Sequence, residues 1–304
     1  MISKAVVEAL QAIVTEEKVH LQEPMARHTT FRVGGPADCL VEINSPQKLK
    51  KTIQYLKLVE IPYVVIGNGS NLLVGDKGYE GVVLQIGSAM SEIRVEGNCI
   101  VAQAGALMSQ IAKAALEHGL TGFEFASGIP GSIGGGVVMN AGAYGGELKQ
   151  VITAVNVLNH KGEELELDNA TMEFGYRTSV IKHRDFVVTG VTICLTPGDP
   201  EAIKAQMDDL AARRREKQPL EYPSAGSTFK RPEGYFAGEL IMKAGLRGYQ
   251  IGGARVADKH CGFIVNMGGA CAADVMDVIC EVQSRVKEKF NVDLEPEVIM
   301  LGEF

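Results

Sequence analysis

Residues 128–145 read GIPGSIGGGVVMNAGAYG and hold seven glycines in eighteen positions. Glycine adopts positive φ angles at no steric cost and leaves backbone N–H groups uncovered, so dense glycine runs often surround a ligand, commonly a phosphate. A mobile surface linker is the alternative, but linkers combine glycine with serine and charge, whereas this run carries apolar residues such as Ile133 and Val137. The stretch therefore predicts a loop that cradles a ligand.

Two further glycine turns support one extended ligand. GNGSNL at 67–72 follows an apolar strand-like segment and approaches the dinucleotide fingerprint G-x-G-x-x-G, but it ends in Leu72 and runs into strand-like sequence, which excludes a Rossmann fold. The third turn lies in TTFRVGGPA at 29–37. Any one of them is equally well a tight turn in an α+β domain, whereas three together indicate a dinucleotide such as FAD. The candidate cofactor-binding residues are Thr30, Gly67, Asn68, Gly69, Ser70, Asn71, Gly131, Ser132, Gly134 and Gly135.

Length and composition narrow the class of protein. The chain has 304 residues, of which 46% are hydrophobic and 22% charged, as in a globular protein with room for about two domains. A net charge of −7 argues against a nucleic-acid partner bound over a large face, because such binding needs a basic surface. The opening segment MISKAVVEALQAIVTEE predicts an amphipathic helix rather than a signal peptide, and no apolar run reaches membrane-spanning length. We therefore expect a cytoplasmic protein without membrane insertion.

The six cysteines do not suggest a metal or redox centre. They stand at positions 39, 99, 194, 261, 271 and 280, with no C-x-x-C pair among them. Because cytoplasmic thiols are normally kept reduced, we expect all six to be reduced core residues, and we expect no metal site.

The hydrophobic pattern alternates helices and strands up to about residue 218. Helical stripes are predicted at 46–60 and 107–120, and strands at 62–66, 81–86 and 98–105. Residues 151–167 predict two strands joined by a turn at Lys161 and Gly162, followed by a buried strand from 186.

The third predicted unit follows a long helix. DPEAIKAQMDDLAARRREKQ at 199–218 predicts that helix, and its basic end, followed by Pro219 and Pro223, predicts a domain boundary. Beyond it, 238–246 and 272–290 look helical, while CGFIVN and EVIML look like strands, so we expect a small α+β unit.

Six strings occur along the chain in a diagnostic order: HTTFRVGG, IGNGSNLLV, GIPGSIGGGVVMNAGAYGGE, YRTS, AGSTFKRP and EPEV. The glycine turns alone resemble the wide vanillyl-alcohol-oxidase-like (PCMH-type) flavoproteins. Together with YRTS, AGSTFK and EPEV, the whole chain resembles the UDP-N-acetylenolpyruvoylglucosamine reductase family. The resemblance implies an α+β fold with an FAD-binding domain at 1–212, made of two subdomains split near 67–75, and a substrate-binding domain at 213–304.

The resemblance also implies an activity. In this family NADPH reduces a noncovalently bound FAD, which passes a hydride to the enolpyruvyl ether of UDP-N-acetylglucosamine enolpyruvate. The product is UDP-N-acetylmuramate, a precursor of peptidoglycan. The glycine run at 128–145 then looks like a loop packed against the FAD diphosphate and flavin.

Three catalytic residues carry over from these motifs: Arg177, Ser227 and Glu297. Hydride transfer to an enolpyruvyl group leaves negative charge that spreads onto the carboxylate, so the site needs cationic stabilisation and a proton donor. Arg177 offers a permanent charge, Ser227 a proton, and Glu297 a hydrogen-bond partner whose pKa burial would raise. Outside these motifs, each would be read as a surface ion-pair, turn or solvated residue.

Substrate contacts are implied less sharply. Lys217 matches the family's diphosphate-binding lysine and Arg214 is its weaker companion, although cations are favoured at any helix end. His260 occupies the place of a glutamine near the sugar, and a structural histidine is the alternative. The chain resembles the shorter family type, which lacks the inserted tyrosine segment after YRTS, and Arg231 replaces an asparagine.

Two rival functions remain open at this stage. One is a flavin oxidase or dehydrogenase of the same fold acting on another alcohol or sugar, in which flavin is often attached covalently. The other is a nonenzymatic flavin or nucleotide-sugar sensor.

Overall fold

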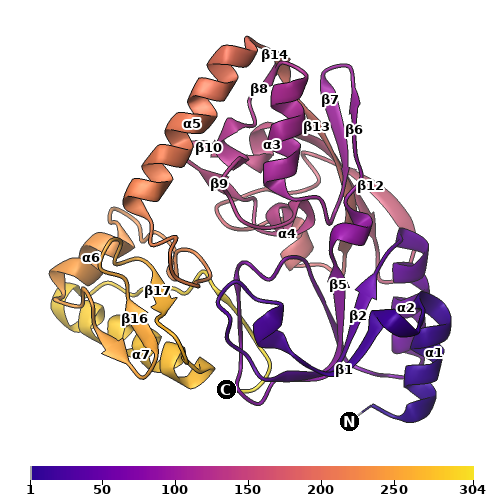
Figure 1. Cartoon of the computed structure of the whole chain (residues 1–304), viewed down its shortest axis with the longest axis horizontal. Coiled ribbons are helices and arrows are strands. Elements are labelled where there is room, and N and C mark those ends of the chain that lie inside the picture. Colours follow the sequence, from indigo (N-terminus) through magenta and orange to yellow (C-terminus); the bar gives the residue numbers. More distant parts are fainter. Residues whose placement is uncertain (1) are drawn as a thin grey trace.

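A computed structural model describes residues 2–304 and shows three bodies arranged around a central junction (Figure 1). Two belong to the N-terminal two thirds of the chain, and the third is the C-terminal region drawn in orange and yellow. Within residues 2–304 no helix is long and apolar enough to cross a bilayer, and no group of three or more His, Cys, Asp or Glu side chains is placed to hold a metal.

The first subdomain is a four-stranded sheet with two helices packed against it. Its strands, in spatial order, are β1 (Val19–Pro24), β2 (Pro36–Ile43), β5 (Tyr79–Ile86) and β3 (Tyr63–Ile66). The helices are α1 (Lys4–Val14) and α2 (Pro46–Leu58), and α2 begins where the Ser45 hydroxyl accepts the Lys48 N–H. Strands β2, β5 and β3 are parallel, so their carboxyl ends share one edge, and the 67–71 turn leaves the sheet there.

The second subdomain is a five-stranded antiparallel sheet. Its strands, in spatial order, are β12 (Glu164–Asp168), β11 (Ile152–Leu158), β13 (Val187–Cys194), β7 (Cys99–Gln103) and β6 (Ile93–Glu96). It also contains α3 (Met108–Glu117), α4 (Ile133–Val138) and two short pairs, β8 (Leu120–Thr121) with β14 (Thr196–Pro197) and β9 (Gly142–Ala143) with β10 (Gly146–Glu147). Buried residues of the two subdomains, from Val6 to Leu195, form one continuous core.

Helix α5 (Pro200–Lys217) leads to the third body (Figure 1). Asp199 caps its first turn by accepting the Glu201 N–H. The C-terminal region contains α6 (Ala237–Lys243), α7 (Ala272–Phe290) and a small antiparallel sheet of β15 (Gln250–Ile251), β16 (Ala254–Val256) and β17 (Ile264–Asn266). The division expected between 212 and 213 falls inside α5, which is continuous to Lys217.

The end of the chain returns to the first subdomain. Strand β18 (Ile299–Leu301) pairs in parallel with β4 (Leu72–Val74) instead of joining the C-terminal sheet. Phe31, Val33 and Leu73 of the first subdomain in turn lie in the core of the C-terminal region. EVIML thus contains the predicted strand, but that strand pairs with the first subdomain, because an apolar run does not specify its pairing partner.

Two further expectations differ from the structure. The expected split near 67–75 falls inside the first subdomain, since β5 lies between β2 and β3 and the chain enters the second sheet only at β6. The glycine run at 128–145 is not loop throughout, because Ile133–Val138 forms α4. Its apolar side chains pack inward and its glycines allow close approach to neighbouring backbone.

The cysteines also differ from the prediction. Cys99 and Cys194 lie opposite each other on β7 and β13 and are joined by a disulfide. Of the four free cysteines, Cys39 and Cys261 are buried, whereas Cys280 is exposed. The prediction of six reduced core thiols is therefore wrong, because a spacing of 95 residues carries no sign of this cross-strand pairing.

Candidate active site

One cavity gathers the glycine turns predicted to hold a cofactor. It has a volume of about 380 Å³ and lies between the 67–72 turn, the 129–132 segment and α4. Three residues from distant parts of the chain complete its wall: Arg177, Ser227 and Glu297. Thus the glycine-rich segments and the three candidate catalytic residues meet at one place.

The adjacent glycines of α4 face different surroundings. A Cβ on Gly135 would meet only the Ser132 Oγ, at 3.7 Å, and this face of the helix lines the cavity. A Cβ on Gly134 would lie 2.8 Å from the Ala104 Cβ, inside the protein core. The space beside Gly135 is therefore a cradle that a side chain would fill, whereas Gly134 is required for packing.

The 67–71 turn is held by its neighbours. Gly69 has a φ of +63°, and a Cβ there would collide with the His28 carbonyl. Ser70 Oγ donates to the Pro130 carbonyl at 3.0 Å, which ties the turn to the second glycine segment. The amide nitrogen of Asn71 donates to the backbone carbonyl of Glu297 at 3.1 Å. Two of the predicted cofactor residues thus have protein partners.

A second cavity of about 290 Å³ adjoins the first and shares Gly67, Asn68 and Ser132 with it. It runs between 85–89 of the first subdomain and 105–110 of the second. The two cavities together form an elongated, glycine-lined space between the subdomains, which suits a dinucleotide such as FAD. Residues 85–89 carry no glycine cluster, so sequence reasoning missed this extension.

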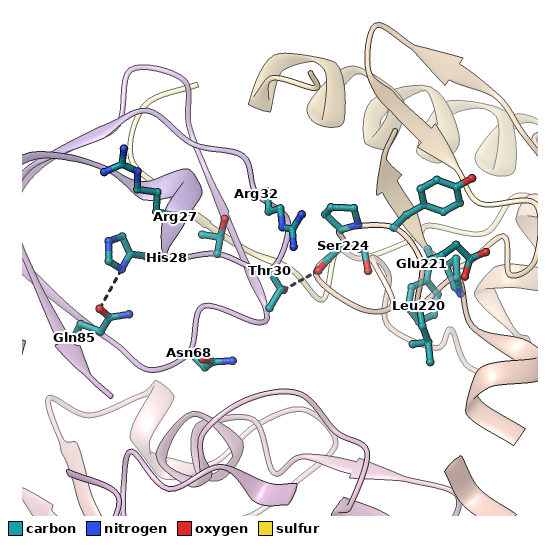
Figure 2. A pocket seen from close by; sticks show the side chains of 14 residues that line it. Arg27, His28, Thr30, Arg32, Asn68, Gln85, Leu220, Glu221 and Ser224 are labelled. Atoms are coloured by element: carbon teal, nitrogen blue, oxygen red, sulfur yellow. Dashed lines mark hydrogen bonds between the residues drawn. The ribbon is translucent and has the colours of Figure 1, made fainter. Parts of the chain in front are cut away.

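Thr30 lies in a separate cleft of about 500 Å³ between 27–32 and 219–224 (Figure 2). Its hydroxyl donates to the Ser224 carbonyl at 2.7 Å, and His28 contacts Gln85 on the other side of the same cleft. Thr30 therefore connects the first subdomain to the segment after α5, and it does not line the glycine-rich cavity. Among the predicted cofactor residues, Asn68 is shared by all three spaces.

Arg177 and Glu297 form a partly buried ion pair in the wall of the cavity. Arg177 Nε donates to Glu297 Oε1 at 2.7 Å, and the two side chains are 22% and 15% exposed. A second guanidinium nitrogen donates to the Gly142 carbonyl at 3.2 Å, and Lys182 Nζ donates to the Arg177 carbonyl at 3.4 Å. Arg177 itself has a φ of 56°, an unusual conformation for a side-chain-bearing residue.

Burial raises the pKa of Glu297 above its usual value, although Arg177, Lys230 and Lys182 favour the charged form. Desolvation is the largest of these effects. The carboxyl therefore holds a proton more readily than a solvated glutamate would. Lys182 and Lys230 were missed as neighbours of Glu297, although they stand close behind the YRTS and AGSTF motifs.

Ser227 follows Gly226, whose φ is +78°, in a turn that pairs with Phe263. Its side chain is exposed to the cavity, and within residues 2–304 its hydroxyl has no hydrogen-bond partner. The neighbouring Thr228, by contrast, is buried and accepts the Ile264 N–H. A hydroxyl that is fixed in place but unpartnered is free to contact a ligand.

A further cavity of about 420 Å³ lies in the C-terminal region and shares Arg177, Ser227 and Glu297 with the glycine-lined one. The three residues therefore stand where the two cavities meet. Several cationic side chains line this cavity. The C-terminal region contributes Arg231, Arg247 and Lys259.

His260 also lines this cavity, as predicted for a substrate contact. Its Nδ1 accepts the Gly262 N–H at 3.1 Å, which leaves Nε2 to carry the proton of the neutral ring. Burial lowers the pKa of His260 and so favours that neutral ring.

The wall of the same cavity carries an aromatic and cationic cluster, of which the sequence analysis had singled out only Arg231. The Arg231 guanidinium lies 3.9 Å from the Phe236 ring centre. The Tyr176 hydroxyl accepts the Arg231 N–H at 3.1 Å and so connects the second subdomain to the C-terminal region. Tyr176 stands within YRTS, the only sequence signal that marked it.

The two predicted diphosphate contacts lie apart from these cavities. Arg214 is 8% exposed, packs beside Gly128 and lies 5.8 Å from the Tyr144 ring centre, with one buried guanidinium nitrogen unpaired. Lys217 is exposed at the end of α5 and lines none of the cavities described above. The structure thus brings His260 to the site, but not Arg214 or Lys217.

Two family models match the chain, and so do many curated proteins. Residues 37–168 match an FAD binding domain, and residues 218–301 match the C-terminal domain of UDP-N-acetylenolpyruvoylglucosamine reductase. The UDP-N-acetylenolpyruvoylglucosamine reductase of Caldanaerobacter subterraneus subsp. tengcongensis is 52% identical over 99% of both chains. That of Agathobacter rectalis is 52% identical over 96% of this chain and 98% of its own.

Solved structures agree with these matches. The crystal structure of UDP-N-acetylenolpyruvylglucosamine reductase (MurB) from Thermus caldophilus is 35% identical, covers 93% of this chain and 98% of its own, and gives a TM-score of 0.80. An alkyldihydroxyacetonephosphate synthase is 14% identical, covers 65% of this chain and 41% of its own, gives a TM-score of 0.50 and shows a likeness of fold alone. The predicted vanillyl-alcohol-oxidase-like α+β fold is confirmed, and the chain belongs to the UDP-N-acetylenolpyruvoylglucosamine reductase family.

Proposed function

We propose that this FAD-dependent oxidoreductase uses NADPH to reduce UDP-N-acetylglucosamine enolpyruvate to UDP-N-acetylmuramate. The observation that carries the proposal is that Arg177, Ser227 and Glu297 line both the glycine-rich cavity and the cation-rich cavity of the C-terminal region. A group that acts on substrate beside a cofactor has to stand at such a boundary. The reaction is a cytoplasmic step of peptidoglycan synthesis, on which the cell wall, cell shape and cell division depend.

The glycine-lined space would hold FAD through backbone N–H groups of the 67–71 turn and of Gly131 and Ser132, and Gly135 leaves room for it beside α4. Bound noncovalently there, FAD supplies hydride transfer from NADPH to the substrate. Everything else in the reaction depends on protein side chains.

Arg177 stabilises the negative charge that develops on the substrate carboxylate. Two of its guanidinium nitrogens bind Glu297 and Gly142, which fixes the plane of the group and leaves further N–H donors for substrate. An arginine already held in place costs no reorganisation when the charge forms, and this is the main source of electrostatic catalysis.

Glu297 orients Arg177 and offers a hydrogen bond of its own. Because burial raises its pKa, the carboxyl can take up a proton when a second carboxylate enters the cavity, and a protonated carboxyl donates to the substrate instead of repelling it. Ser227 then delivers a proton to the carbon that carries the new charge. A hydroxyl is a weak acid, but a carboxylate enolate is a strong base, so the transfer is favourable.

The cation-rich cavity and its surroundings would bind the nucleotide sugar. Neutral His260 would present its Nε2 proton to the substrate. Lys217, exposed at the end of α5 and outside these cavities, would meet a diphosphate that extends beyond them. Arg214, buried earlier in the same helix, is proposed as its weaker companion.

The test is spectroscopic. Purified protein should show the absorbance of oxidised flavin, lose it on addition of NADPH, and regain it without oxygen when UDP-N-acetylglucosamine enolpyruvate is added, with a product two mass units heavier than the substrate. Steady NADPH oxidation without that substrate would instead indicate an oxidase, and no NADPH oxidation would indicate a sensor. Flavin retained in acid-precipitated protein would overturn the noncovalent assignment.

A further inference from the structure

Glu297 is held by all three bodies of the molecule. Its N–H donates to the Thr228 carbonyl of the C-terminal region at 2.8 Å. Its carboxylate accepts from Arg177 of the second subdomain at 2.7 Å, and its carbonyl accepts from the Asn71 side chain of the first subdomain at 3.1 Å. One residue thus depends on three separate parts of the chain for its position.

Asn71 holds this segment twice. Besides the side-chain bond to Glu297, its own carbonyl accepts the Ile299 N–H at 2.9 Å. The next residue, Leu72, is the first of the β4–β18 pairs, opposite Ile299. Asn71 therefore holds the backbone immediately after Glu297 with two hydrogen bonds. It belongs to the turn that also lines the cofactor cavity.

We propose that the side chain of Asn71, expected from the sequence to bind the cofactor, is instead a positioning group for Glu297. This inference rests on the role proposed for Glu297. The side-chain amide satisfies the Glu297 carbonyl and holds the carboxyl at the distance from Arg177 that the reaction needs. The cofactor turn and the substrate-facing carboxyl are thereby joined by a single side chain.

The physical consequence is specific. The Asn71 side-chain bond is partly buried, so its loss leaves the Glu297 carbonyl without a partner and removes one of the hydrogen bonds that fix the 295–299 segment. Because Arg177 Nε is bonded to the Glu297 carboxylate, the guanidinium would move with it. The predicted defect lies in substrate reduction, not in cofactor binding.

The test uses Asn71→Leu, which keeps the shape of the side chain but removes the amide donor. We expect FAD retention and flavin reduction by NADPH within about twofold of wild type, and reoxidation by the enolpyruvyl substrate slowed by about tenfold, as for one lost hydrogen bond. The fall should appear in kcat with KM little changed. Amide hydrogen exchange of the 295–301 segment should rise in the substrate-free protein, and Asn71→Gln, which keeps an amide, should recover part of the rate.

A matched control removes two other hydrogen bonds between the same two bodies. Asp76 of the first subdomain accepts the N–H groups of Ala272 and Ala273 at 2.7 and 2.9 Å, far from Glu297 in the chain and without contact to it. Asp76→Ala should leave the half-reactions unchanged. An equal defect in both variants would show that only general docking matters and would overturn the inference.

Two other results would also overturn it: loss of FAD from Asn71→Leu, which makes Asn71 a cofactor ligand first, and unchanged reoxidation. If the Leu variant does not fold, Asn71→Asp, which is isosteric and cannot donate, carries the same test. Failure of the proposed function is separate, since it would show as wild-type turnover in Glu297→Gln or as no turnover in the wild-type protein.

Discussion

Arg177 Nε and Glu297 Oε1 lie 2.7 Å apart although 120 residues separate them in the chain. The arginine lies in a turn of the second subdomain, whereas the glutamate lies on the segment that returns from the C-terminal region to the first subdomain. The pair therefore forms only when all three bodies are assembled. Both residues line the boundary between the two cavities, so the site is complete only when the three bodies are packed together.

Two adjacent glycines of α4, Gly134 and Gly135, predict different defects. Gly135→Val should lower the amount of FAD that purified protein retains, because the side chain would enter the cradle, while the melting temperature of the apoprotein changes little. Gly134→Val should lower the melting temperature itself, because its Cβ meets Ala104. The ratio of flavin to protein absorbance and thermal denaturation separate the two. Full flavin occupancy in Gly135→Val would contradict the assignment of the cavity.

Ser227→Ala should separate the half-reactions. A proton donor to the substrate has no part in taking hydride from NADPH, so the variant should reduce its flavin at a near-normal rate. Reoxidation by the enolpyruvyl substrate should slow by about 10² to 10⁴, as for a lost general acid. Stopped-flow absorbance measures both steps, and Ser224→Ala in the same segment is the control. Reoxidation at the wild-type rate would make Ser227 a turn residue.

Glu297→Gln should slow substrate reduction and become more stable relative to wild type as pH rises. Because burial raises the pKa of Glu297, the folded state binds this proton more tightly than the unfolded state does, and the free energy of unfolding falls as pH rises from the usual pKa of 4.5 through the folded value. The variant lacks this loss. Its stability relative to wild type should therefore increase between about pH 4 and pH 7, while substrate reduction falls by at least about a hundredfold.

Denaturation by urea across that pH range measures the effect. Glu295→Gln is the control, since that carboxylate is 69% exposed and pairs with Lys230 on the surface. A relative stability of Glu297→Gln that does not change with pH would show that the carboxyl is ordinary in the folded protein.

Lys217→Ala should raise the KM for the UDP-sugar by about tenfold to a hundredfold, the cost of a charge-assisted hydrogen bond, with flavin reduction by NADPH unchanged. Arg213→Ala is the matched control on the same helix, since its side chain is 55% exposed and pairs with Asp209. Steady-state kinetics with varied UDP-sugar decides the question. An unchanged KM would leave Lys217 as a solvated residue at the end of α5.

The disulfide predicts a thiol count. Protein denatured without a reductant should react with a thiol reagent at four positions, Cys39, Cys261, Cys271 and Cys280, and at six after reduction. Cys99→Ser should lower the melting temperature under oxidising conditions, because the bond closes a long loop in the unfolded chain, and should match wild type in reductant. Six thiols before reduction would restore the expectation drawn from the sequence.

Local sequence was enough to predict most elements. The helices α1, α2, α3, α5 and α7 and the strands β3, β5, β7, β11, β12 and β13 follow from hydrophobic period and turn residues, which act over a few neighbouring positions. The same local chemistry marked the glycine turns, and the motifs marked Arg177, Ser227 and Glu297, which the structure brings to one cavity.

Pairing over long distances was decided only in the folded molecule. An apolar run such as EVIML indicates a strand but does not say that the strand will lie beside β4, because the pairing depends on which surfaces the other elements leave open. The hydrogen bond from Asn71 to Glu297 beside this pair joins residues 226 positions apart. The same holds for Cys99 with Cys194. It also holds for Gly134 and Gly135, adjacent in sequence but turned by one helical step toward core and cavity, so burial, charge partners and the pKa of Glu297 all follow from tertiary packing.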